Sequence, residues 1–131
     1  MKLRDEWADD RYGGSCKGWL RKGTVFMIDG KRVVLSVQAS FAHYSKPREN
    51  WVRLDECSEV EVALVNDDLR TTEEIRQAAH SKPRTDMYLP SQLGIEGFDD
   101  YFSSDHIAGY VPIGVVESLA DELAKIGTIV G

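Results

Sequence analysis

The chain has 131 residues, of which 42% are hydrophobic and 29% charged, and these proportions exclude a largely disordered protein. Its net charge of −6 is uneven, because residues 1–50 hold ten Lys or Arg and six Asp or Glu, whereas residues 51–131 hold six and sixteen. An acidic second half argues against direct nucleic-acid binding and favours a partner with a basic surface, unless the acidity serves only solubility.

The N-terminal residues 1–22 mix charges with scattered aromatics and lack a hydrophobic period. We expect a single domain over residues 1–131, with residues 1–22 as a loosely attached arm. The opening MKLRDEWADD is too polar for a signal peptide, and no apolar run approaches the length of a membrane span. The sequence therefore predicts a cytoplasmic protein that does not enter a membrane. Reduced thiols are the default expectation for Cys16 and Cys57, and a disulfide between them is the alternative, which no pattern indicates.

The stretch of residues 23–38, GTVFMIDGKRVVLSVQ, predicts a β-hairpin. Asp29 and Gly30 favour a type I′ turn, because both central positions of that turn need positive φ. With Ile28 opposite Lys31, apolar side chains fall on both faces. We therefore expect this hairpin to lie centrally in a sheet.

Two further strands are expected after a polar loop over residues 39–50. WVRL, residues 51–54, can form a short strand. SEVEVALV, residues 58–65, alternates apolar and polar side chains, which is typical of a strand with one buried face.

Two helices are predicted in the acidic half. Thr71 and Glu74 suit a capping box for a short helix over residues 72–80. Residues 83–109 are rich in Pro, Gly, Asp and Ser and suggest a long functional loop, with short pieces of structure around 87–89 and 98–102. Residues 112–126 have the apolar period of an amphipathic helix, with Pro112 at its first position and Gly127 at its end.

Together these elements predict an α+β fold. The expected sheet is small and mainly antiparallel, with the hairpin of residues 23–38 at its centre and strands near 51–54 and 58–65 beside it. The C-terminal helix and the short helix are expected to cover the sheet.

A short repetition is the most specific pattern in the chain. Residues 42–48, AHYSKPR, recur as residues 79–84, AHSKPR, with one residue removed. Each copy offers a hydroxyl and two cations in an exposed turn, a combination that can hold a phosphate or a carboxylate. If the two loops meet, they form an anion-binding patch from His43, Lys46, Arg48, His80, Lys82 and Arg84. Coincidence is the alternative explanation.

No motif predicts a metal, a cofactor or a catalytic residue. Asp99, Asp100, Asp105 and His106 are metal-ligand types, but their spacing matches no known loop, and a solvated acidic loop fits them better. The two cysteines and three histidines are linked by no catalytic motif, so whether the chain is an enzyme stays open, with a non-enzymatic role favoured.

Two segments resemble small uncharacterised proteins of tailed bacteriophages. They are HYSKPREN followed by EVEVAL, residues 43–50 and 59–64, and GYVPIGVVESLADEL, residues 109–123. The resemblance spans about a quarter of the chain. It implies an accessory phage protein acting in the host cytoplasm, and it transfers no catalytic residue.

The sequence favours a non-enzymatic binding or inhibitor protein that targets a host or defence protein with a basic surface. The acidic residues expected to contact this partner are Glu59, Glu61, Asp67, Asp68, Asp99, Asp100 and Asp105. The alternative is a small enzyme or ligand-binding domain for a phosphorylated or anionic molecule. It would be built on the two repeated loops, residues 42–48 and 79–84 (the AH-SKPR loops). A third possibility is a structural subunit of a larger assembly.

Overall fold

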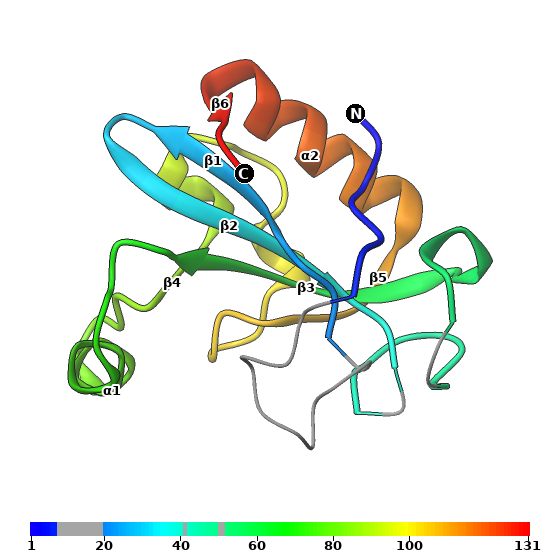
Figure 1. Cartoon of the computed structure of the whole chain (residues 1–131), viewed down its shortest axis with the longest axis horizontal. Helices are drawn as coiled ribbons and strands as arrows, with labels where there is room; N and C mark the ends of the chain where they lie inside the picture. The colour runs from blue at the N-terminus through cyan, green and yellow to red at the C-terminus, as the bar shows by residue number, and fades with distance from the viewer. Residues whose placement is uncertain (8–19, 41, 50–51) are drawn as a thin grey trace.

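The computed structural model describes residues 1–7, 20–40, 42–49 and 52–131. Within these residues, one antiparallel sheet and two α-helices give the expected α+β fold (Figure 1). The sheet order is β4-β3-β2-β1-β6, and β5 also pairs with β3. The elements are β1 (Thr24–Ile28), β2 (Lys31–Gln38), β3 (Glu59–Asn66), α1 (Thr72–His80), β4 (Met87–Tyr88), β5 (Ala108–Pro112), α2 (Ile113–Ile126) and β6 (Thr128–Ile129).

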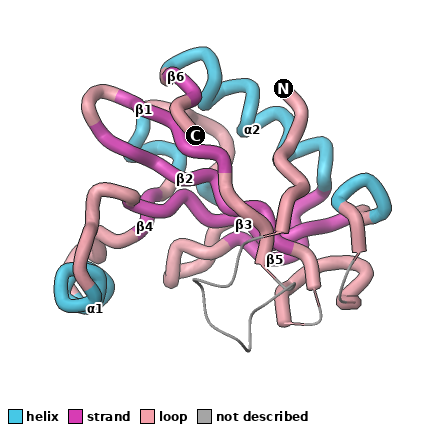
Figure 2. Tube along the Cα trace, viewed as in Figure 1, coloured by secondary structure: helices cyan, strands magenta, loops and turns pink. Residues whose placement is uncertain are grey.

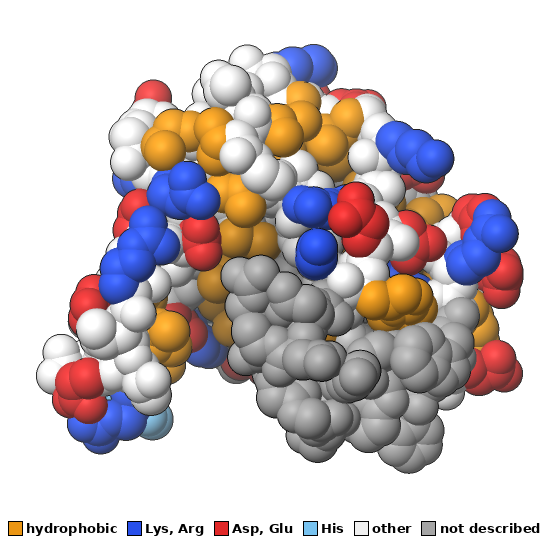
Figure 3. Space-filling model, in the orientation of Figure 1, with side chains coloured by type: hydrophobic (Ala, Val, Ile, Leu, Met, Phe, Trp, Pro, Cys, Tyr) orange, Lys and Arg blue, Asp and Glu red, His pale blue; other side chains and the backbone are white. Residues whose placement is uncertain are grey.

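The predicted hairpin is confirmed as β1 and β2. Ile28 pairs with Lys31, and φ is +49° at Asp29 and +78° at Gly30, as a type I′ turn requires. Both strands have neighbours on their outer sides, because β6 pairs with β1 and β3 pairs with β2. In the view of Figure 3, hydrophobic side chains lie over β1 and β2. The hairpin is therefore the centre of the sheet.

The predicted strand at 58–65 is confirmed as β3, and its outer edge serves two partners. Residues 59–62 pair with β5, whereas residues 64–65 pair with β4. At about 3.3 Å per residue, β3 spans roughly 23 Å. The residues opposite Glu59 and Val65 are therefore well separated, whereas the near ends of β5 and β4 lie opposite Val62 and Leu64, two residues apart.

The C-terminal helix α2 covers one face of the sheet, as predicted (Figure 1). Val116, Leu119 and Leu123 are buried on the helix and pack with Phe26 and Leu64 of the sheet in one hydrophobic core. Pro112 is the last residue of β5 and the N-cap of α2, one position earlier than predicted. No helix among the described residues is long and apolar enough to cross a membrane.

The prediction of a strand at residues 51–54 is wrong for the described residues 52–54. Leu54 instead begins a single 3₁₀ turn, Leu54–Glu56. The backbone N–H of Leu54 donates to Asp5 Oδ2 at 2.8 Å, and that of Cys57 donates to Leu54 O. The N-terminal segment and the turn itself therefore satisfy donors that a neighbouring strand would otherwise take.

The helix predicted at 72–80 is confirmed as α1, but the expectation that it covers the sheet is wrong. Figures 1 and 2 show α1 standing apart from the sheet, and Ala78 is its one buried residue. Its sequence TEEIRQAAH holds too few large apolar residues to form a stripe, and Ile75 is left 48% exposed. Its N-cap is as predicted, since Thr71 Oγ1 accepts from Glu74 N at 3.1 Å.

The long segment 83–109 has more structure than expected at its start and middle. It contains β4 and two 3₁₀ turns, Pro90–Leu93 and Asp99–Tyr101, close to the short pieces expected around 87–89 and 98–102. Its last residues enter β5, which the sequence did not predict. This segment carries one wall of the cleft described below.

The described parts of the N-terminal arm, residues 1–7 and 20–22, contact the domain. Met1 and Leu3 pack against the core, and Trp7 forms an isolated antiparallel bridge with Arg21. Arg21 is buried at 3% exposure. Residues 8–19, with Cys16, lie outside the described residues.

Candidate functional site

An open cleft of about 390 Å³ lies beside β5. It is built by four segments: the loop after β2, the first half of β3, the segment 101–107, and β5. The residues that line it are Tyr44, Glu61, Tyr101, Ser103, Asp105, Ile107 and Gly109. It thus combines two aromatic side chains with two carboxylates, and none of its described lining residues is cationic.

The first wall is fixed by backbone hydrogen bonds at Tyr44. Its N–H donates to Glu61 Oε2 at 2.9 Å, and its carbonyl oxygen accepts from Tyr110 N at 2.9 Å. A Cβ at Gly109 would lie 2.9 Å from Tyr44 Cβ, closer than side chains approach one another. Glycine at 109 is therefore what allows the Tyr44 loop to lie directly on β5.

Each carboxylate of the cleft accepts the fold's hydrogen bonds through one of its two oxygens. Glu61 Oε2 accepts from Tyr44 N, and Asp105 Oδ1 accepts from the Ser103 hydroxyl and from Ile107 N. Among the described residues, no donor bonds Glu61 Oε1 or Asp105 Oδ2. The Ser103 hydroxyl bond lowers the pKa of Asp105, so this carboxylate is anionic at neutral pH.

Exposed tyrosines surround the same cleft. Tyr44 is 53% exposed, Tyr101 43% and Tyr110 40%. The Tyr44 and Tyr110 ring centroids are 5.7 Å apart, and the Arg48 guanidinium lies 5.4 Å from the Tyr44 centroid. Exposed aromatic side chains are enriched in protein interfaces, where they contribute a large contact area.

The seven acidic residues singled out in the sequence divide into groups. Glu61 and Asp105 line the cleft, and the exposed Asp100 directly precedes Tyr101. Glu59 pairs with Lys46 at 3.1 Å, and Asp99 accepts from the backbone and hydroxyl of Ser91.

The remaining two, Asp67 and Asp68, lie beyond the far end of β3. There Asp67 Oδ2 accepts from Arg32 Nε at 3.2 Å and Asp68 Oδ2 from Arg32 N at 3.1 Å. The structure therefore brings together only part of the predicted acidic surface.

The two AH-SKPR loops share local geometry. Ser45 Oγ donates to Pro47 O at 3.0 Å and Ser81 Oγ donates to Pro83 O at 2.8 Å, and both Lys–Pro peptide bonds are cis. The sequence repetition is thus also a repetition of local structure.

These loops are not brought to one place. The first bridges to the start of β3 at Lys46–Glu59, whereas the second precedes β4, which pairs near the end of β3. Arg84 makes a two-bond contact with Asp86, at 2.8 and 2.9 Å. His80, the last residue of α1, and Lys82 just after the helix are exposed and lie apart from His43 and Arg48. The six residues therefore do not form one patch.

His43 makes a close contact that the sequence did not indicate. Its Nδ1 lies 2.6 Å from the hydroxyl of Ser40, which also accepts from Ala42 N at 3.0 Å. A hydroxyl beside an imidazole resembles a nucleophile with its base, but Ser40 is fully buried and no substrate can reach it. The contact stabilises the turn that carries Tyr44.

The burial of His43 predicts a pH-dependent stability. Burial lowers the pKa of His43, against the opposing effect of Glu61, and Arg21 and Arg48 lower it further. Below the unfolded-state value of about 6.5, the unfolded chain binds a proton more readily than the folded chain. Stability should therefore fall as the pH decreases from about 7.5 to about 5.5.

Urea unfolding midpoints across this pH range measure the effect. The His43→Asn variant retains a hydrogen-bonding group near Ser40 and cannot gain the proton, so its midpoint should fall less than that of the wild type. Parallel pH profiles for the two proteins would show that His43 does not carry the effect.

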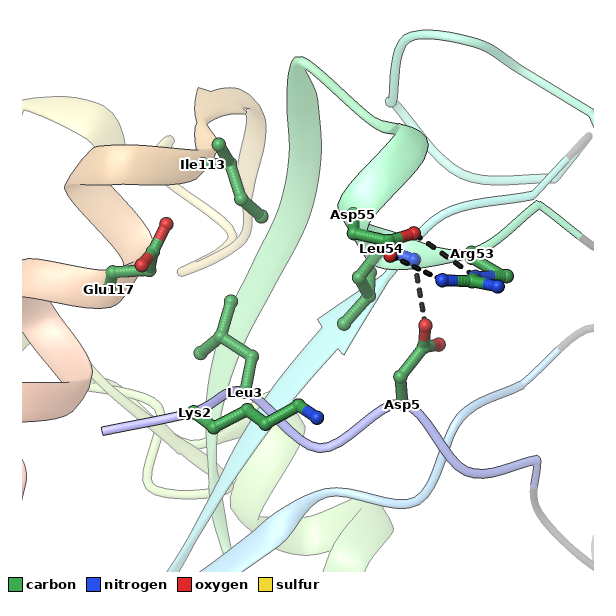
Figure 4. A pocket seen from close by; sticks show the side chains of 8 residues that line it. All are labelled: Lys2, Leu3, Asp5, Arg53, Leu54, Asp55, Ile113 and Glu117. Atoms are coloured by element: carbon green, nitrogen blue, oxygen red, sulfur yellow. Dashed lines mark hydrogen bonds and ion pairs between the residues drawn. The ribbon is translucent and has the colours of Figure 1, made fainter.

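A second cavity, of about 280 Å³, lies between the N-terminal segment, the 3₁₀ turn Leu54–Glu56 and the start of α2. Figure 4 shows Leu3, Leu54 and Ile113 pointing into it. Most of its charged rim is engaged, because Arg53 pairs with Asp55, and Asp5 bonds Leu54 N and Arg21. This cavity therefore offers fewer free polar groups than the cleft.

Neither a metal centre nor a reactive thiol is formed by the described residues. No group of three or more His, Cys, Asp or Glu among them could hold a metal ion. Burial raises the pKa of the Cys57 thiol, which keeps it protonated at neutral pH.

Searches against family models, curated protein sequences and solved structures found no match to this chain.

Proposed function

We propose that this chain is a binding protein that uses the cleft beside β5 to engage a partner with a basic surface. The observation that carries the proposal is that Glu61 and Asp105 lie with exposed tyrosines in one cleft, each with one oxygen that no donor among the described residues bonds. Carboxylates speed the encounter with a basic surface, and aromatic side chains supply contact area once it is bound. A host or defence protein remains the expected partner.

Several features near the cleft support an acidic binding surface. Asp100 adds an exposed carboxylate beside Tyr101, and the second half of the chain carries the acidic excess. Nearby cations already have partners: Lys46 pairs with Glu59, and Arg84 pairs with Asp86. Arg84 also lies near Asp105, since its Nη1 donates to the backbone oxygen of Asp105 at 2.7 Å, but no internal cation pairs with the carboxylate of Glu61 or Asp105 among the described residues.

The proposal is tested by capture of a partner on the immobilised full chain and on the Glu61→Gln/Asp105→Asn double variant. We expect the wild type to retain a basic protein from a host lysate and to release it as salt rises, because exposed charge pairs are screened. The double variant should bind the isolated partner at least about tenfold more weakly, since each lost charge contact costs about 1 kcal/mol.

Asp29→Asn is the matched control, because it removes an exposed carboxylate at the hairpin tip, away from the cleft. This variant should bind as the wild type does. The control removes one charge and the double variant two, so a loss in the control about half as large in free energy as that of the double variant would point to net charge alone. A partner whose affinity is unchanged by salt and by the double variant would refute the proposal.

The alternative, an anion-binding or catalytic role for the two AH-SKPR loops, stays a prediction. The separation of the loops along β3 gives it no specific support.

A further inference from the structure

We propose that the cleft beside β5 receives the guanidinium group of a single arginine side chain from its protein partner. This inference rests on the proposed function and names the chemistry that the partner must present. It places the arginine between the ring of Tyr101 and the free carboxylate oxygens of Glu61 and Asp105.

The lining of the cleft selects a cation. Two carboxylates contribute, no lining side chain in the described part of the chain is cationic, and Asp105 is kept anionic by its hydrogen bonds. Aromatic rings attract cations through the negative potential of their faces, so Tyr44 and Tyr101 add to the same selection. A neutral or anionic group would form no ion pair with either carboxylate, and Asp105 would keep only the nearby charge of Arg84.

The combination of rings and carboxylates favours arginine over lysine. A guanidinium is planar, so it stacks on a ring while its N–H groups donate in the plane to carboxylate oxygens. The chain already contains two guanidinium groups that lie over aromatic rings. Arg48 lies over Tyr44, and the Arg21 guanidinium lies 4.5 Å from the Trp7 ring centroid. A lysine ammonium has no planar surface to stack on a ring and no N–H donors spread in such a plane.

The rim indicates that the arginine belongs to a polypeptide. Tyr110 is exposed next to Tyr44 but does not line the cleft, and Asp100 is exposed next to Tyr101. These side chains lie where residues flanking a bound arginine would make contact. A free small cation would use none of this surface.

The test is a titration of the isotope-labelled full chain, followed by NMR, with three blocked peptides. They are N-acetyl-Gly-Arg-Gly amide and its counterparts with citrulline or lysine in place of arginine. Citrulline has nearly the shape of arginine but no charge. The arginine peptide should shift the amides of Tyr44, Tyr101 and Asp105, with the citrulline peptide at least tenfold weaker and the lysine peptide clearly weaker.

Three variants in the cleft and one control variant at the hairpin tip locate the contact. Tyr101→Leu keeps an apolar side chain but removes the ring, and Glu61→Gln keeps the acceptor for Tyr44 N but removes the charge. Each should weaken arginine-peptide binding several-fold, whereas Asp29→Asn should leave it unchanged. Gly109→Ala places a Cβ against Tyr44 and should weaken binding through the shape of the cleft.

Equal binding of the arginine and citrulline peptides, equal binding of arginine and lysine, or shifts confined to other surfaces would each overturn this inference. Its failure can be told apart from failure of the proposed function. If partner capture depends on Glu61 and Asp105 but the arginine peptide causes no shifts, the acidic surface binds and the arginine assignment is wrong.

Discussion

Replacing Leu123 by Ala should destabilise the protein by about 2–5 kcal/mol, the range for removing a large aliphatic side chain from a packed core. Leu123 is fully buried on the face of α2 that packs on the sheet. The end of the helix has little room to close the resulting cavity, because Gly127 lies against Ile28 and the carbonyl oxygen of Met27. Urea unfolding monitored by circular dichroism measures the change.

Ile126→Ala is the matched control for Leu123→Ala. The helical spacing in the sequence puts both residues on one apolar stripe, but Ile126 is 41% exposed in the structure. Its truncation should cost clearly less, below about 1 kcal/mol, because much of the side chain is already in water. Similar losses for the two variants would mean that α2 packs on the sheet in another rotation.

Local signals in the sequence were sufficient for the elements whose stability is local. The hairpin register follows from the turn chemistry of Asp29 and Gly30, and α1 begins where Thr71 can cap it. The strands that were missed, β5 and β6, depend on distant partners: β5 pairs with β3, and β6 pairs with β1 across about one hundred residues. A sequence pattern of two to five residues cannot specify such pairings.

Gly127 lies at the predicted end of α2, but the structural reason for a glycine there differs from the expected one. The sequence indicates a glycine that ends α2, and its N–H does donate to Leu123 O at 2.9 Å. Its φ of −135° is ordinary extended backbone, so no left-handed conformation is needed. A Cβ there would lie 2.6 Å from Ile28 Cγ1, and close approach of the chain to β1 is the reason for glycine.

The candidate site was only partly visible in the sequence. Composition identified Glu61 and Asp105 among seven acidic residues, but nothing in it could show that only these two line one cleft. The sequence distinguishes Tyr44 only as the additional residue of the first AH-SKPR copy. Tyr101 had none, because its place in the cleft depends on how residues 99–109 fold back on β3.

The buried guanidinium of Arg21 should be the most sensitive polar group in the described structure. Its Nε donates to Asp5 at 2.6 Å, its Nη1 donates to Ala39 O at 2.6 Å, and its Nη2 donates to Val52 O. The Gln38 side chain also bonds both backbone groups of Arg21. One residue thus joins the N-terminal segment, the end of β2 and the chain before the 3₁₀ turn.

Arg21→Met should cost about 3–5 kcal/mol, because it leaves Asp5 Oδ1 and two carbonyl oxygens without their donor while keeping a side chain of similar length. Arg53→Met makes the same chemical change at an exposed pair with Asp55 and should leave the urea midpoint unchanged. Because buried charges often gain little over apolar replacements, an unchanged midpoint in Arg21→Met is the informative contrary result. It would mean that hydrophobic contacts, and not this network, hold residues 1–7 on the domain.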